Sequence, residues 1–207
     1  MSFYQRNLPH FVPPGAILFI TFRLEGSLPA EVLYRLLEKA EQAATQQLHQ
    51  PLPEPEKREA LRRLHKQHFA RLDAYLDHAK DGPHWLREPR VATCVAEEIH
   101  RLAEANVKVI SYCLMSNHAH LVVQLPEDGS CSYSHMMKRL KGRTALAANR
   151  LLGRTGTFWQ HESYDHVVRK NGEPERVVAY VLQNPVKAGL VDSWQDWPYS
   201  YWNENVA

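Results

Sequence analysis

The segment that most constrains the fold is a pair of apolar runs between residues 107 and 126. VKVISYCLM and HAHLVVQLP are rich in β-branched residues, and only Ser116 and Asn117 stand between them. Two such runs joined by a short polar link are typical of a β-hairpin. The chain is therefore expected to contain an antiparallel sheet with this hairpin in it.

The other periodic segments give an order of strands and helices around that hairpin. A β-branched run bounded by Gly15 and Gly26 predicts an earlier strand, and the aromatic segment at residues 155–169 predicts a later one. Expected helices cover residues 30–79 with a proline-rich break, 89–105, 134–152 and 174–185. The order is close to the split βαββαβ arrangement of a ferredoxin-like α+β fold with an antiparallel sheet and additional helices. We expect a single domain over residues 1–207, with a helical-hairpin insert at about 30–80.

Composition excludes several classes of protein. The three cysteines stand far apart in no paired or metal-ligand spacing, which favours free thiols in a reducing compartment. The N-terminus lacks a basic-then-apolar signal, and the longest apolar run, Ala16 to Phe22, is too short to cross a bilayer. The expectation is a cytoplasmic protein without a membrane partner.

His118 and His120 are the first candidates for chemistry. Positions two apart on a strand share a face, so both imidazoles should project together, while Ala119, Leu121 and Val123 line the opposite, apolar face. Two convergent imidazoles can begin a metal site, which needs further ligands. The alternative is a pair of partly exposed strand histidines satisfied by hydrogen bonds.

Tyr180 and Asn184 form a second candidate pair. They are four apart on the expected helix, hence on one face about one turn from each other. Val177, Tyr180, Val181 and Asn184 also make one stripe, so the tyrosine could equally be a core residue.

Both pairs of residues lie in blocks that resemble one family. LPHFVPPGAILFITFRLEGSLP, MSNHAHLVV, FWQHESYDHVVR and YVLQNPVKAGLV are similar to successive segments of the REP-associated tyrosine transposases, within the HUH single-strand DNA transposase superfamily. The resemblance runs from about Leu8 to Trp202, and residues 46–70 contribute little to it. Ser116 stands where the family usually has proline, and Ala119 is a small version of the hydrophobic residue between the histidines.

The resemblance implies a metal-dependent single-stranded DNA endonuclease and transposase. Such an enzyme cleaves and rejoins DNA at hairpin, REP-like sequences through a covalent 5'-phosphotyrosine. The resemblance assigns the role of nucleophile to Tyr180, and it assigns the binding of a divalent ion, Mg²⁺ or Mn²⁺, to His118, His120 and Asn184. No general base is evident beside Tyr180. Tyr164 competes for the nucleophile role, with Asp165 and His166 beside it, but it has no polar residue at a helical i+4 position.

Basic residues are concentrated after the hairpin. Next to a nuclease site they are expected to contact single-stranded or hairpin DNA, whereas on an ordinary helix they would form a solvated face. They are Lys138, Arg139, Lys141, Arg143, Arg150, Arg154, Arg169 and Lys170. The resemblance places the protein at the bacterial nucleoid, as a monomer or homodimer.

Two other functions stay open. One is a non-catalytic DNA-hairpin-binding protein of the same fold. The other is a histidine-triad-like nucleotide hydrolase, in which Val122 would occupy the third histidine position.

Overall fold

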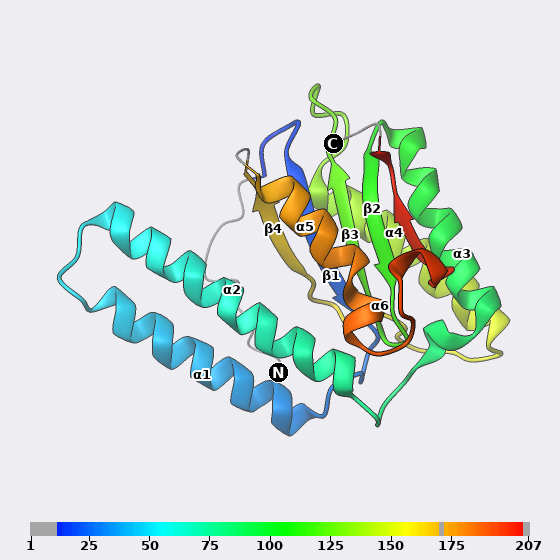
Figure 1. Cartoon of the computed structure of the whole chain (residues 1–207), viewed down its shortest axis with the longest axis horizontal. Helices are drawn as coiled ribbons and strands as arrows, with labels where there is room; N and C mark the ends of the chain where they lie inside the picture. The colour runs from blue at the N-terminus through cyan, green and yellow to red at the C-terminus, as the bar shows by residue number, and fades with distance from the viewer. Residues whose placement is uncertain (1–11, 170–171, 205–207) are drawn as a thin grey trace.

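The computed structural model describes residues 12–169 and 172–204, which form one five-stranded sheet with helices on both faces (Figure 1). The strand order is β4-β1-β3-β2-β5, and every neighbouring pair is antiparallel. The strands are β1 (Ile17–Arg23), β2 (Lys108–Leu114), β3 (His118–Gln124), β4 (Tyr164–Val168) and β5 (Ser200–Trp202). The predicted α+β class with its antiparallel sheet is confirmed.

The predicted hairpin is formed by β2 and β3. Leu114 pairs with Ala119, and the backbone N–H of Met115 donates to the carbonyl of His118 at 2.9 Å. Alternation along β3 divides the core into two parts, as expected. Leu121 and its same-face neighbours pack against one set of helices, and Val122 faces the other set with the two histidines.

The helices follow this division. Met136 and Leu140 of α4 and Val95 of α3 pack on the Leu121 face, whereas Val178 and Val181 of α5 pack on the Val122 face. In Figure 1 α5 lies in front of the sheet and α4 behind it. The bounds are α3 (Pro89–His100), α4 (Tyr133–Leu151), α5 (Glu173–Leu182) and α6 (Asn184–Lys187), with 3₁₀ turns at Trp85–Arg87, Arg101–Ala105 and Trp194–Asp196.

The insert between β1 and α3 is a helical hairpin made of α1 (Ala30–Leu48) and α2 (Glu54–His78). α2 begins after Pro53, with Pro55 in its first turn, where proline has no helical hydrogen bond to lose. The two ends of the insert meet, since a Cβ added to Gly82 would lie 2.8 Å from the carbonyl oxygen of Gly26. The hairpin thus leaves and rejoins the sheet domain at one place, and α2 runs back beside α5 (Figure 1).

Some expected boundaries were wrong. The strand expected across residues 155–169 is limited to β4, and Trp159 makes only an isolated bridge to Leu24. The helix expected to continue to Pro185 ends at Leu182, and α6 follows after Gln183. In the described residues no helix combines the length and apolarity that a membrane span requires.

Candidate active site

His118 and His120 lie side by side at the start of β3, on the face that α5 and α2 cover. Both are fully buried, and their Nε2 atoms are 3.0 Å apart. Their Nδ1 atoms contact other groups: His118 Nδ1 lies 2.7 Å from Asn117 Oδ1, and His120 Nδ1 lies 2.7 Å from Thr21 Oγ1. The two imidazoles therefore converge through Nε2, as their spacing predicted.

Asn117 determines which nitrogen of His118 carries a proton. Its Nδ2 donates to the carbonyl of Leu76 at 3.0 Å, which turns Oδ1 toward the imidazole. An amide oxygen only accepts, so His118 Nδ1 must donate and Nε2 keeps its lone pair. A hydrogen bond of this kind at the far nitrogen is the usual support of a metal-binding histidine.

Burial keeps both imidazoles neutral. Removal from solvent lowers the pKa of His118 to about 3, with the neighbouring His120 adding to the effect. Removal from solvent also lowers the pKa of His120 to about 3, helped by the positive charge of Lys187. Neutral imidazole is the form that binds metal ions.

Asp73 of α2 is the third member of this cluster, and sequence reasoning missed it. Asp73 is 3% exposed, and its Oδ1 lies 3.4 Å from His120 Nε2 and 3.9 Å from His118 Nε2. Oδ1 has no hydrogen-bond partner among the described residues. Burial raises the pKa of Asp73, while the nearby histidine, tyrosine and lysine oppose this. One signal was available, because Asp73 interrupts the buried stripe of Phe69 and Leu76 on an amphipathic helix.

The three side chains fit a divalent ion. They supply two nitrogens and one oxygen whose atoms all lie within 4.8 Å of one another. A point equidistant from the three atoms lies about 2 Å from each, close to the 2.0–2.2 Å at which Zn²⁺ binds imidazole and carboxylate. Asp77, one turn further along α2, places Oδ1 3.7 Å from His118 Nε2; burial, with the charge of Asp73, raises its pKa to about 7.

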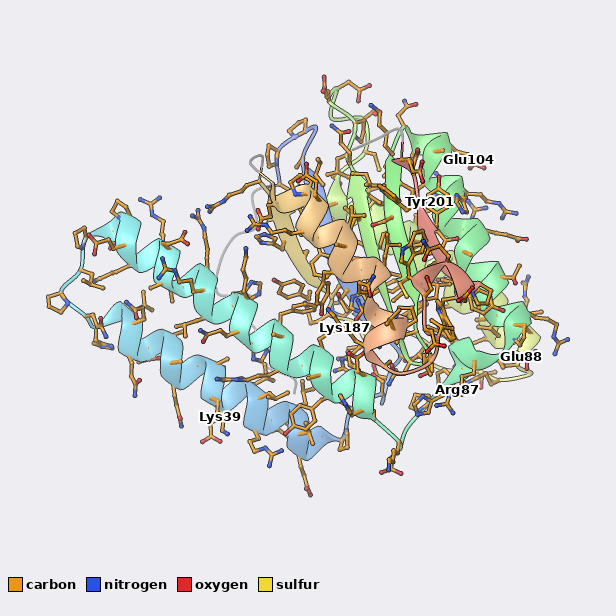
Figure 2. The ribbon with its side chains drawn as sticks, viewed as in Figure 1. Lys39, Arg87, Glu88, Glu104, Lys187 and Tyr201 are labelled. Carbon is orange, nitrogen blue, oxygen red and sulfur yellow. The ribbon has the colours of Figure 1, made fainter. Side chains whose placement is uncertain are left out.

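Tyr180 of α5 borders the cluster. Its hydroxyl donates to Asp73 Oδ2, and its ring centroid lies 5.8 Å from that of His120. Burial, followed by the charge of Asp73, raises the pKa of this hydroxyl, so it is protonated at neutral pH. The exposed Lys187 of α6, also missed from the sequence, places Nζ 4.3 Å from the Tyr180 ring centroid (Figure 2 labels Lys187).

Asn184 is buried at the junction of α5 and α6. Its Nδ2 donates to the carbonyls of Tyr180 at 2.8 Å and Val181 at 3.3 Å. These hydrogen bonds give a donor to two backbone carbonyl groups at the C-terminal end of α5. Its Oδ1 has no hydrogen-bond partner within the described residues. The amide nitrogen is thus used structurally, and the oxygen is the atom that could contact a ligand.

Tyr164 occupies a different position from Tyr180. It stacks on Phe69 of α2 with ring centroids 4.0 Å apart, and burial raises the pKa of its hydroxyl. His166 contacts Glu173 Oε1 at 3.0 Å, and Asp165 alternates with it to the other face of the sheet. Tyr164 therefore helps to join the insert to the sheet.

The basic residues expected to contact DNA differ in how they are used. Helix α4 lies on the sheet face opposite the histidines, and Arg139 and Arg143 form ion pairs with Glu104 and Glu98 at 2.8 and 3.0 Å. Glu104 follows α3 at the side of the molecule away from the insert (Figure 2).

Some of the other basic residues contact neighbouring groups of the protein, and the rest are exposed to solvent. Lys141 donates to the carbonyls of Gln160 and His161, and the Arg154 guanidinium lies 3.7 Å from the Trp85 ring centroid. Arg169 is exposed, 3.9 Å from Glu59, and Lys170 lies outside the described residues. Lys138 and Arg150 are exposed and have no ion pair within the described part of the chain.

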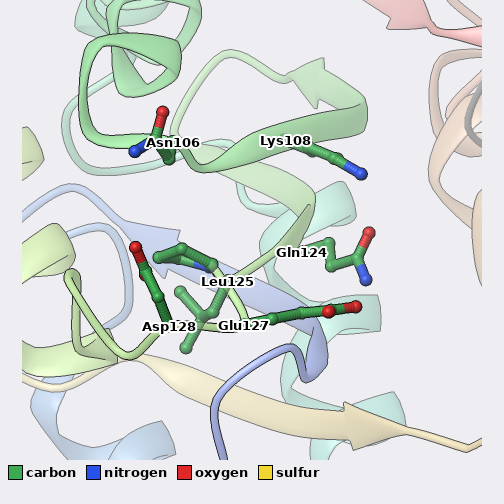
Figure 3. Close-up of a pocket in the computed structure, with 7 residues that line it drawn as sticks. Asn106, Lys108, Gln124, Leu125, Glu127 and Asp128 are labelled. Atoms are coloured by element: carbon green, nitrogen blue, oxygen red, sulfur yellow. The ribbon is translucent and has the colours of Figure 1, made fainter.

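A hollow at the far end of the β2–β3 hairpin is separate from this cluster. Lys108, Gln124, Glu127 and Asp128 line it together with Asn106 and Leu125 (Figure 3). Gln124 ends the strand that His118 begins, and the charges around the hollow are mixed. The hollow contains none of the candidate catalytic groups.

Comparison with known proteins adds to this geometry. Residues 84–184 match the model of the family described as "Transposase IS200 like". The chain is 29% identical over 108 residues to a putative REP-associated tyrosine transposase of Haemophilus influenzae, covering 48% of this chain and 61% of that protein. It is 27% identical over 100 residues to a REP-associated tyrosine transposase of Escherichia coli, covering 48% of this chain and 57% of that protein.

A solved structure described as a REP-associated tyrosine transposase bound to a REP hairpin shares the fold. Its TM-score is 0.55 with 17% identity, over 97% of this chain and 82% of that chain. The sequence matches span less than two thirds of the length of the two curated relatives. Together the comparisons confirm the resemblance to REP-associated tyrosine transposases that the motifs indicated.

Proposed function

We propose, from the likeness to IS200-like and REP-associated tyrosine transposases, that this chain is a metal-dependent single-strand DNA nuclease and strand transferase. Its substrate would be hairpin DNA of REP-like type, in the cytoplasm at the bacterial nucleoid. The observation that carries the proposal is the placement of the Tyr180 ring, 5.8 Å from the His120 ring, beside the two buried histidines, whose Nε2 atoms are 3.0 Å apart. All of these groups come from one chain, so a monomer is sufficient for the site.

The histidines would hold a divalent ion. Asn117 and Thr21 contact the Nδ1 sides of the two rings, so both Nε2 atoms are directed to the same point. When bound, the ion would offset the negative charge of the scissile phosphate and of the leaving 3'-oxygen. Two nitrogens and an oxygen suit Mn²⁺ or a similar first-row ion better than Mg²⁺.

Tyr180 would supply the nucleophile. Its oxygen forms a bond to phosphorus while the bond to the 3'-oxygen breaks; the tyrosine hydroxyl loses its proton and the leaving 3'-oxygen takes one up, so the product is a 5'-phosphotyrosine and a free 3'-hydroxyl. Attack by another 3'-hydroxyl on this ester rejoins DNA and returns the tyrosine. Lys187 is exposed beside the ring, so a phosphate approaching Tyr180 from solvent meets a positive charge.

Asn184 stays a candidate ligand in this proposal. Its free Oδ1 and its place one turn after Tyr180 support such a role. The proposed catalytic domain spans the whole chain, with the α1–α2 hairpin as its insert.

A labelled single-stranded hairpin tests the function. Incubation with the full chain and Mn²⁺ should give a covalent protein–DNA adduct that is absent when EDTA replaces the metal. Binding without any adduct would favour the second candidate, a hairpin-binding protein without turnover. The complete burial of both histidines is the observation that supports that alternative.

A further inference from the structure

We propose that Asp73, from the helical insert, is the third protein ligand of the metal and also holds the nucleophile in position. This inference rests on the proposed metal-dependent function and deepens it. Asp73 lies outside the segment, residues 84–184, that matches the family model. The site would then be completed by an element that belongs to the insert.

The position of the two carboxylate oxygens carries the argument. Oδ1 faces the paired Nε2 atoms at 3.4 and 3.9 Å and has no hydrogen-bond partner among the residues described. Oδ2 accepts the hydrogen bond of the Tyr180 hydroxyl. One oxygen is therefore free for an ion, and the other fixes the nucleophilic oxygen beside it.

Burial makes this arrangement costly without a cation. An isolated buried carboxylate is strongly disfavoured unless it is paired or coordinates a metal. The Nε2 atoms of His118 and His120 also face the same space, so a divalent ion there could bind both nitrogens and the Asp73 oxygen that has no hydrogen-bond partner.

Further contacts hold α2 where Asp73 can reach the site. Phe69, one turn earlier, packs edge-on against Phe19 with centroids 5.4 Å apart and stacks on Tyr164. Leu76, almost one turn later, accepts the hydrogen bond of Asn117, the residue that orients His118. The insert thus supports a histidine as well as supplying the carboxylate.

Asn184 is the competing third ligand, and it differs from Asp73 in charge. Its amide nitrogen is committed to the carbonyls at the end of α5, so the side chain cannot turn without breaking those bonds. An amide oxygen is also neutral, whereas Asp73 supplies a charge that compensates a divalent cation. The two assignments predict different losses of Mn²⁺ affinity when Asp73 or Asn184 is replaced.

Mn²⁺ titration of the metal-stripped full chain, without DNA, tests the proposal. Free Mn²⁺ is followed by electron paramagnetic resonance. Asp73→Asn should weaken Mn²⁺ binding at least about 100-fold, since changes to residues that only support ligands already cost 10–100-fold. Asn184→Ala should have a smaller effect. Glu56→Gln, the same chemical change at an exposed position of α2, should leave the affinity unchanged.

Folding is checked separately from binding. The amide oxygen of Asp73→Asn can still accept from Tyr180, so the metal-free variant should melt at or above the temperature of the unaltered chain. Asp73→Glu should bind Mn²⁺ more tightly than Asp73→Asn, because it restores the charge.

Three results would overturn the assignment. They are unchanged affinity in Asp73→Asn, a larger loss in Asn184→Ala than in Asp73→Asn, and no Mn²⁺ binding by the unaltered chain. DNA is absent throughout, so the outcome does not depend on cleavage. A chain that binds Mn²⁺ through Asp73 but forms no DNA adduct would support this assignment and contradict the proposed nuclease function.

Discussion

Replacing Glu173 by glutamine should weaken the attachment of the insert to the helix that carries Tyr180. Glu173 begins α5 and receives hydrogen bonds from Lys66 Nζ of α2 at 2.7 Å, the Arg169 backbone N–H at 2.7 Å and His166 Nε2 at 3.0 Å. One carboxylate therefore joins the insert, β4 and α5. Glutamine keeps the shape but loses the charge that these donors stabilise.

The size of the effect follows from the pKa of Glu173. Partial burial raises this pKa, but the hydrogen bonds from Lys66, Arg169 and His166 outweigh it and lower the pKa from 4.5 to about 2. Without screening by solvent, a shift of this size corresponds to about 3 kcal/mol of folding free energy. The Lys66 side chain is 52% exposed, so solvent screens the pair, and a loss of about 1–2 kcal/mol is expected at pH 7.

The sign of the pH dependence gives a second check. Because the pKa is lower in the folded chain, the stabilisation is present above pH 4.5 and is lost as the pH falls toward 2. The unfolding free energies of the wild type and Glu173→Gln, from urea titrations at several pH values, should differ at pH 7 and converge below pH 3. Equal stabilities at pH 7, or a difference that persists at low pH, would refute this reasoning.

Three further predictions concern DNA and metal. Lys138→Ala with Arg150→Ala should flatten the dependence of log Kd on log salt for a labelled hairpin by roughly 1.4 to 1.8 if both contact phosphates, as anisotropy titrations would show. Arg143→Ala should change that slope less, because the Arg143 guanidinium is already ion-paired with Glu98 in the unaltered chain. Equal slopes for the two variants would contradict this. Lys187→Met should slow single-turnover adduct formation about 10-fold or more without weakening Mn²⁺ binding, and an unchanged rate would exclude a role at the phosphate. Asn117→Ala should weaken Mn²⁺ binding roughly 10–100-fold by releasing the His118 ring; calorimetry that shows unchanged affinity would contradict the proposed tautomer.

Local patterns predicted the central part of the fold. The apolar runs around Ser116 and Asn117 specified the hairpin, and alternation along β3 placed His118 and His120 together, because a strand has a fixed side-chain period. The three-residue β5 strand escaped prediction, since so short a segment carries no period. Its pairing with β2 depends on where the chain returns after α6.

Less of the candidate site could be predicted from the sequence. Asp73 is 45 positions before His118, and only the docking of the insert against the sheet brings the two together. The pairing of Arg139 and Arg143 with acidic residues of the neighbouring α3 segment likewise depends on helix packing. A helical period predicts which residues share a face, but not which element that face will meet.

Mapping the covalent adduct shows whether Tyr180 forms the bond to DNA. A 3'-labelled hairpin oligonucleotide would be incubated with Mn²⁺ and the full chain, and the modified peptide identified by mass spectrometry. We expect phosphotyrosine at residue 180, complete loss of adduct in Tyr180→Phe with hairpin binding retained, and measurable adduct in Tyr164→Phe. An adduct that persists in Tyr180→Phe, or one that maps to Tyr164, would contradict this assignment.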